Sequence, residues 1–143
     1  MISLSKKILV DSCVWIAAYY KQDKYHEKGK LFIEWLKTQR NVEIIIIDNI
    51  ITETLTFLRK KAKDPATVNE VINIFMEDDR IEIYFTSEEA FYKGLEVFRK
   101  YKALSVVDSI IVVFYFNLNP DYLLSYDARF NSYNEIIRFE EPQ

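Results

Sequence analysis

The chain has 143 residues, half of them hydrophobic, which predicts a single domain over residues 1–143 with a substantial core. With only two Gly and three Pro, it is unlike turn-rich all-β proteins and disordered chains, and one Cys permits neither an intramolecular disulfide nor a Cys-based zinc cluster. The net charge of −3 is unlike the basic charge usual in proteins that bind nucleic acids.

We expect neither a signal peptide nor a membrane-spanning segment in this chain. Residues 1–7 are short and polar, so we expect no signal peptide. The longest apolar run, over 106–116, is interrupted by Asp108 and is too short to span a bilayer, which takes roughly 20 residues. We therefore expect a cytoplasmic protein that does not enter the membrane, consistent with its single cysteine.

The first predicted elements meet at an acidic residue. Residues 7–10 form a short apolar run that predicts a buried strand, and this run ends at Asp11. The pattern from Ser12 onward is helical. Asp11 is either a plain N-cap of that helix, which is a common role for Asp, or part of a site at the end of the strand.

The next segments alternate between helix and strand. Residues 26–38 place apolar side chains on one helix face, whereas 42–47 are rich in β-branched residues and predict a central parallel strand. Asp48 or Asn49 is predicted to cap a helix that ends near residue 61.

A break at Asp64 and Pro65 precedes the second half of the chain. We expect a helix over 66–76, a strand over 81–85, and a further helix that is capped within 86–89 and ends near residue 101.

The last predicted elements are a helix and two strands. Ser105 is expected to cap a helix reaching residue 116, and strands are expected over 122–125 and 136–139. Because strands apolar on both faces alternate with helices, the pattern predicts a three-layer α/β/α sandwich with a mainly parallel sheet.

Four acidic residues lie where such a fold would form a site. Asp11 and Asp127 each follow the end of a predicted strand, and ligands bind at the carboxyl ends of the strands in parallel sheets. Asp108 lies near the start of a helix that is apolar all round, where a carboxylate must be paired, metal-bound or at a cleft. Glu53 lies one turn inside its helix, among apolar neighbours.

Each acid alone has a simpler explanation. Asp108 could be a first-turn acid favoured by the helix dipole or paired with a distant Lys, Glu53 an exposed side chain, and Asp127 a turn or cap residue. Together, however, clustered carboxylates repel one another, and a divalent cation relieves that repulsion. An all-oxygen set favours Mg²⁺ or Mn²⁺, and such sites commonly serve phosphodiester chemistry.

The order and spacing of these acids resemble those of PIN-domain nucleases, including the VapC-like toxins of toxin–antitoxin pairs. The resemblance covers about residues 7–139 and rests on four segments: LVDS (9–12), ITETL (51–55), LSVVDSII (104–111) and LLSYDARF (123–130). Ser125 stands where Thr is common in the family and keeps the hydroxyl.

The resemblance implies a Mg²⁺- or Mn²⁺-dependent endoribonuclease acting on RNA. Asp11 and Asp108 would be the principal metal ligands, and Glu53 and Asp127 would complete the acidic pocket directly or through water. Glu53 or Asp127 would orient the attacking water or act as a base. Toxin members of the family further imply a homodimer and a small antitoxin that blocks the site.

Other functions remain to be weighed against a nuclease. His26 is the only histidine, which disfavours nucleases that need a His pair, and no Gly-x-Ser-x-Gly elbow is present. The alternative from another class is a non-catalytic PIN-like module that binds RNA or a protein. Basic residues that either hold RNA or are solvated helix ends are Arg59, Lys60, Lys61, Lys63, Arg99, Lys100 and Lys102.

Overall fold

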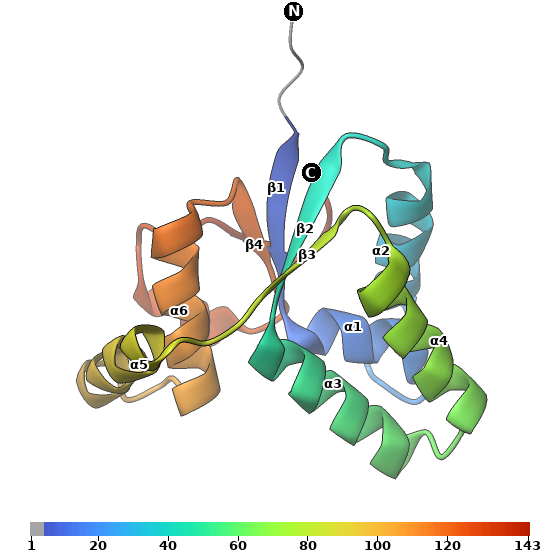
Figure 1. Ribbon diagram of the computed structural model, residues 1–143, viewed down its shortest axis with the longest axis horizontal. Coiled ribbons are helices and arrows are strands. Elements are labelled where there is room, and N and C mark those ends of the chain that lie inside the picture. The colour runs from blue at the N-terminus through green and yellow to red at the C-terminus, as the bar shows by residue number, and fades with distance from the viewer. Residues whose placement is uncertain (1–4) are drawn as a thin grey trace, which may run out of the picture.

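The computed structural model describes residues 5–143; the first four residues of the segment expected to contain no signal peptide lie outside this range. Helices and strands follow one another in the expected alternation (Figure 1). Their bounds are β1 Lys6–Val10, α1 Ser12–Tyr19, α2 His26–Thr38, β2 Val42–Ile47, α3 Asp48–Lys61, α4 Pro65–Glu77, β3 Ile81–Tyr84, α5 Glu88–Lys100, α6 Val106–Leu118, β4 Tyr122–Leu124, the 3₁₀ helix η1 Ala128–Ser132 and β5 Arg138–Phe139.

The five strands form one parallel sheet in the order β3-β2-β1-β4-β5. Ile8 of β1 is paired with Ile44 of β2 on one side and with Tyr122 of β4 on the other, so β1 is central. Figure 1 shows α1 to α4 on one side of the sheet and α5 and α6 on the other. The predicted α/β/α sandwich is confirmed, and the strand order reverses between β1 and β4, where such sheets bind ligands.

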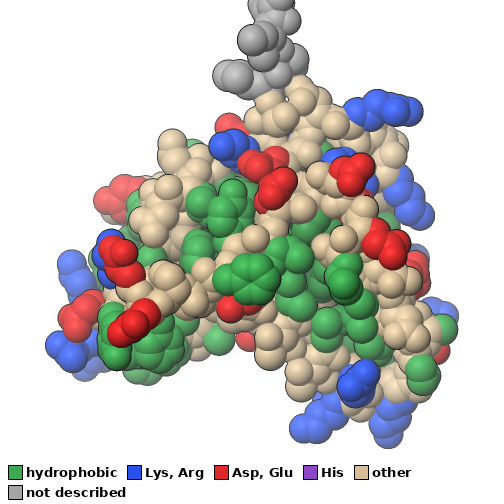
Figure 2. Space-filling model, in the orientation of Figure 1, with side chains coloured by type: hydrophobic (Ala, Val, Ile, Leu, Met, Phe, Trp, Pro, Cys, Tyr) green, Lys and Arg blue, Asp and Glu red, His purple; other side chains and the backbone are tan. Residues whose placement is uncertain are grey.

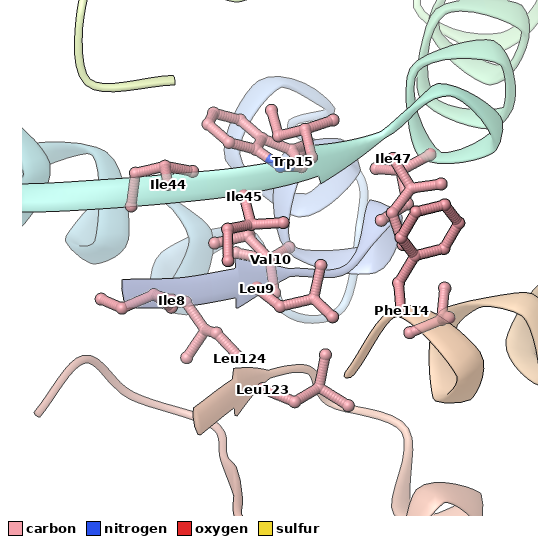
Figure 3. Close-up of a cluster of buried hydrophobic side chains, with 14 of the residues drawn as sticks. Ile8, Leu9, Val10, Trp15, Ile44, Ile45, Ile47, Phe114, Leu123 and Leu124 are labelled. Carbon is pink, nitrogen blue, oxygen red and sulfur yellow. The ribbon is translucent and has the colours of Figure 1, made fainter. Parts of the chain in front are cut away.

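The strands are buried on both faces, as their apolar sequences predict. Side chains of β1, β2 and β4 pack together in the centre of the molecule (Figure 3). Ile8, Leu9 and Val10 are fully buried, and so is Trp15 at the start of α1. The Trp15 ring meets those of Phe32 and Phe75 edge to face, with centroids 5.3 and 5.0 Å away. This packing fixes α1, and hence the end of β1, against α2 and α4.

The helix after β2 begins differently from the prediction. Asp48 or Asn49 was expected to be its cap, but α3 starts at Asp48, and Ile47 occupies the cap position without a side-chain bond. Asp48 Oδ1 instead accepts bonds from Asn49 N at 3.0 Å and from the N and Oγ1 of Thr86 at 3.1 and 2.6 Å. The carboxylate therefore ties the start of α3 to the segment after β3.

The remaining differences are small. The last strand is shorter than expected, covering Arg138–Phe139, and η1 was not predicted. Among residues 5–143, no helix combines the length and apolar character needed to cross a membrane.

Candidate active site

The four predicted acids all lie at the carboxyl edge of the sheet or at helix starts next to it. Asp11 follows β1, and Asp127 follows β4 by three residues. Asp108 is in the first turn of α6, and Glu53 is in the second turn of α3. In Figure 1, α1 and α3 begin at the lower centre of the molecule, where β1 and β2 end.

Asp11 is buried and held from two elements. Its Oδ1 accepts a bond from Ser12 N at 2.8 Å as the N-cap of α1. Its Oδ2 accepts a bond from Ser125 Oγ, after β4, also at 2.8 Å. Asp11 is thus both the cap that the simpler explanation proposed and a side chain fixed at the switch point of the sheet.

Glu53 is joined to the same corner through Ser12. Ser12 is buried, and its Oγ donates a short hydrogen bond to Glu53 Oε1. Within residues 5–143, Oε2 of Glu53 accepts no hydrogen bond, and the side chain is exposed. The helix face of α3 therefore presents one fixed and one open carboxylate oxygen beside Asp11.

Asp108 is anchored by a capping box at the start of α6. Ser105 Oγ accepts a bond from Asp108 N at 3.0 Å, and Ser105 N donates to Asp108 Oδ2 at 3.1 Å. Asp108 is 8% exposed, as expected for a residue on an apolar, buried helix. The bonded oxygen is Oδ2, and Oδ1 accepts no bond from the described residues.

Asp127 is occupied by a neighbouring base. Arg129 Nε lies 2.9 and 3.0 Å from its two carboxylate oxygens, and Nη2 lies 2.5 Å from Oδ2. Asp127 Oδ1 also accepts a bond from Arg129 N as the N-cap of η1. The cap role that was the simpler explanation for Asp127 is therefore present, together with an ion pair that no sequence pattern indicated.

Arg129 also reaches the next acid. Its Nη2 lies 3.6 Å from Asp108 Oδ2, and its Nη1 donates to Ala103 O at 3.4 Å. The distant base considered for Asp108 is thus an Arg after β4 rather than a Lys. Arg129 is the base in contact with both Asp127 and Asp108, and the charge of Arg138 also acts on Asp127.

The electrostatics distinguish Asp11 from Asp127. Burial raises the pKa of Asp11 from 3.8 to about 6, and repulsion from Asp108 and Glu53 adds to the rise, although the bonds from Ser125 and Ser12 oppose it. The hydrogen bonds from Arg129 lower the pKa of Asp127 instead. Asp11 is therefore a buried carboxylate with like charges nearby and, within residues 5–143, no Lys or Arg within ion-pair distance.

These residues fit a hard divalent cation. Asp11 and Asp108 offer oxygen atoms only, and burial together with the charges of Asp108 and Glu53 raises the pKa of Asp11, so a bound cation would stabilise its ionised form. The side chains of residues 5–143 do not form a ready cluster of three or more metal-ligating groups. Mg²⁺, however, is usually bound through one or two carboxylates with several waters, so a pair of carboxylates is a sufficient donor set.

Three residues outside the predicted set of acids complete this corner. Ser125 had a signal, since its hydroxyl lies in the fourth acidic segment, and Ser12 directly follows the first acid. Arg129 had none, because an Arg two residues after a capping Asp is an ordinary surface feature. Only the fold brings it beside Asp108.

The basic residues of α3 lie at the other end of that helix from the acids. Arg59, Lys60 and Lys61 form its last turn, and Figure 2 shows Lys and Arg side chains gathered there. Next to them, a hollow of about 390 Å³ lies between α3 and α4. It contains a single acid, Asp64, and is therefore not the acidic site.

Comparison with known proteins connects this geometry to one family. The PIN-domain family model matches residues 8–136. A VapC ribonuclease from Archaeoglobus fulgidus is 31% identical over 126 residues, which span 86% of this chain and 78% of that protein.

Two solved structures share the fold. VapC20 from Mycobacterium tuberculosis, described as a sarcin-ricin loop cleaving toxin, superposes with a TM-score of 0.75 at 14% identity, covering 91% of this chain and 96% of that one. A toxin–antitoxin complex from Klebsiella pneumoniae gives a TM-score of 0.58 at 15% identity, with 85% and 87% of the two chains covered. At these sequence identities, the two structures show a shared fold and nothing further about function.

Proposed function

This chain belongs to the PIN-domain family, and on that premise we propose that it is a Mg²⁺- or Mn²⁺-dependent endoribonuclease, the toxin of a toxin–antitoxin pair. The observation that carries the proposal is that two buried carboxylates from separate elements, Asp11 and Asp108, lie close enough to repel each other. This repulsion contributes to the rise in the pKa of Asp11. A VapC ribonuclease as a relative at 31% identity supports RNA as the substrate.

In the proposed mechanism, Asp11 and Asp108 would hold the cation, which would lower the pKa of a water molecule and place positive charge beside a phosphate oxygen. Ser125 and Ser12 fix the orientation of the Asp11 carboxylate, and Ser105 fixes that of Asp108. These contacts place both ligands before the substrate arrives, which reduces the cost of organising the site.

Glu53 is the residue best placed to take a proton from the attacking water. Ser12 holds its Oε1, while Oε2 is open at an exposed position. Asp127 is less suited to this role because Arg129 engages both of its oxygens. We therefore assign the base to Glu53, and assign to Asp127 a contribution to the acidic pocket through water or through Arg129.

The proposed partners are a small antitoxin and a second copy of the chain. A similar structure, from Klebsiella pneumoniae, is a toxin–antitoxin complex, which supports the antitoxin. For the homodimer, the support within this chain is the row of half-exposed aromatic side chains on α5, formed by Phe91, Tyr92 and Phe98.

The test is cleavage of a mixed, end-labelled RNA pool in Mg²⁺, Mn²⁺ or EDTA. We expect cleavage in either metal, none in EDTA, and a loss of at least a hundredfold in Asp108→Asn, because the variant removes one metal-holding carboxylate. The matched control is Asp79→Asn, which makes the same change at an exposed position before β3, at the opposite edge of the sheet.

Two outcomes would contradict the proposal. Cleavage that persists in EDTA or in Asp108→Asn would exclude these carboxylates as the metal site. RNA binding without cleavage in any metal would favour the non-catalytic binding module instead.

A further inference from the structure

Arg129 is half exposed, although its side-chain nitrogens contact acids at the carboxyl edge of the sheet and the backbone beside them. Its Nε and Nη2 contact Asp127, its Nη2 also approaches Asp108, and its Nη1 reaches Ala103 O at 3.4 Å. The side chain is 54% exposed, in contrast to the 11% of Asp108. Arg129 therefore lies on the solvent side of Asp108.

Asp127 fixes one edge of the guanidinium and leaves the other edge available. A guanidinium has five N–H groups. The Nε–Nη2 edge is taken up by the Asp127 carboxylate. Among the described residues, Nη1 makes only the 3.4 Å bond to Ala103 O, and the contact of Nη2 with Asp108 Oδ2 is 3.6 Å, which is long for a charged pair. The Nη1–Nη2 edge is therefore a planar pair of donors that these long contacts leave available to a ligand.

An RNA phosphate needs such a donor here. The carboxyl edge of the sheet carries four carboxylates, which repel the negatively charged RNA backbone. The basic residues of α3 lie in the last turn of that helix, away from Glu53. When Asp108 is engaged by a cation, its contact with Arg129 is no longer needed for charge balance. Arg129 remains held by Asp127, with its outer edge ready for a phosphate oxygen pair.

We propose that Arg129 binds the RNA phosphodiester at the active site and that Asp127 is the residue that positions it. This inference rests on the proposed ribonuclease function and adds a substrate-contacting residue to it. It also gives Asp127 a role that its occupied oxygens allow.

The test measures binding of a fluorescein-labelled, ten-nucleotide single-stranded RNA by anisotropy, with Ca²⁺ replacing Mg²⁺ and gels confirming that the RNA is intact. Binding is measured at several NaCl concentrations. We expect Arg129→Gln to bind about tenfold more weakly, with the slope of log K against log salt smaller by about 0.7, the value for one lost single-strand phosphate contact. Arg40→Gln, at an exposed position before β2 on the opposite edge, should match the wild type.

A second variant separates charge from shape. Arg129→Lys keeps a cation beside Asp127, so we expect an unchanged salt slope but binding several-fold weaker, because a Lys does not bind two phosphate oxygens in one plane. If Arg129 only stabilised η1, Arg129→Gln would lower the melting temperature and leave the salt slope as in the wild type. That result, or wild-type affinity in both variants, would overturn the inference.

Metal-dependent cleavage by the wild type, measured in parallel, separates this inference from the function on which it rests. Wild-type cleavage together with wild-type RNA binding by Arg129→Gln would overturn the role of Arg129 alone. Absence of both cleavage and RNA binding in the wild type would overturn the ribonuclease function and this inference with it.

Discussion

Asp11 is the residue at which folding and chemistry make opposite demands. As the N-cap of α1 it accepts hydrogen bonds that favour its ionised form. Burial and the neighbouring carboxylates Asp108 and Glu53 disfavour that form and bring its pKa to about 6. The ionised carboxylate that a metal needs is therefore costly in the metal-free protein, and replacing it should show the cost directly.

Asp11→Asn is expected to stabilise the metal-free protein above pH 6. Because the pKa of Asp11 is about 6 in the folded protein and the ordinary value for Asp is 3.8, the folded state binds the proton more tightly than the unfolded chain does. The stability that protonated Asp11 contributes to the folded state is complete below about pH 4 and is lost as the pH rises through 6. The difference corresponds to about 3 kcal/mol at most.

Urea unfolding in EDTA measures this effect. At pH 7.5 the Asn variant should be more stable than the wild type by up to about 3 kcal/mol, and near pH 4 the two should be similar. A variant that is less stable at pH 7.5 would show that the bonds from Ser12 and Ser125 outweigh burial.

At this scale the sequence could indicate the acids but not their partners. Asp11 and Asp127 follow strand ends, and Asp108 interrupts an apolar helix, so each is conspicuous along the chain. The partner of Asp108, by contrast, is Arg129, 21 positions away, and the partner of Glu53 is Ser12. Such pairs depend on how strand ends and helix starts meet, which no local pattern encodes.

Helices α1 and α2 pack closely, and a glycine makes this possible. A Cβ on Gly29 would lie 2.3 Å from Ala18 N and 2.6 Å from Ala17 C, both backbone atoms of α1. A Cβ on Gly94 of α5 would instead meet the side-chain atom Ile110 Cγ1 at 2.6 Å. The two sites therefore differ in whether the obstructing atom can move by itself.

Gly29→Ala is expected to destabilise the protein by about 3 kcal/mol, because α1 must shift as a whole to admit the methyl group. Gly94→Ala should change stability by no more than about 1 kcal/mol, because Ile110 can adjust and Ala favours the helix. Urea midpoints of the two variants, which make the same substitution in different helices, test the contrast. Equal losses would show that the α1–α2 contact is not rigid.

The helices and central strands could be predicted because their apolar periodicity is long and regular. The strand over Val42–Ile47 and the helix over His26–Thr38 match their predicted bounds. The short elements could not: η1 is set by the Asp127 cap and its ion pair, and β5 by pairing with β4. The predicted cap of α3 was wrong because Asp48 accepts hydrogen bonds from Thr86, 38 positions away.

For the whole molecule, the strand order explains why the acids converge. The chain adds β2 and β3 on one side of β1 and then crosses to β4 on the other. The segments that follow β1 and β4 therefore leave the sheet next to each other, at the same carboxyl edge. Asp11 and Ser125 meet there at 2.8 Å, although 114 positions separate them. A cation bound by Asp11 and Asp108 would join the end of β1 to the start of α6. The unfolded chain does not bring these two carboxylates together, so the cation would bind the folded state alone.

Mg²⁺ or Mn²⁺ should therefore stabilise the folded protein. At about 100 times the dissociation constant, binding to the folded state alone adds about 2.7 kcal/mol, or a rise of about 5–10 °C in melting temperature for a chain of this size. Thermal melts at pH 7.5 with metal and with EDTA measure the effect. Asp108→Asn and Asp11→Asn should lose it, whereas Asp79→Asn should keep it.

The two Asp11 predictions together give a result that a purely structural carboxylate would not produce. In EDTA, Asp11→Asn should melt above the wild type, because the variant removes a buried charge. As metal is added, the wild type should gain stability while the variant does not, so the gap should narrow or reverse. A constant gap at all metal concentrations would mean that the cation does not bind at Asp11, and the metal site would have to be sought elsewhere.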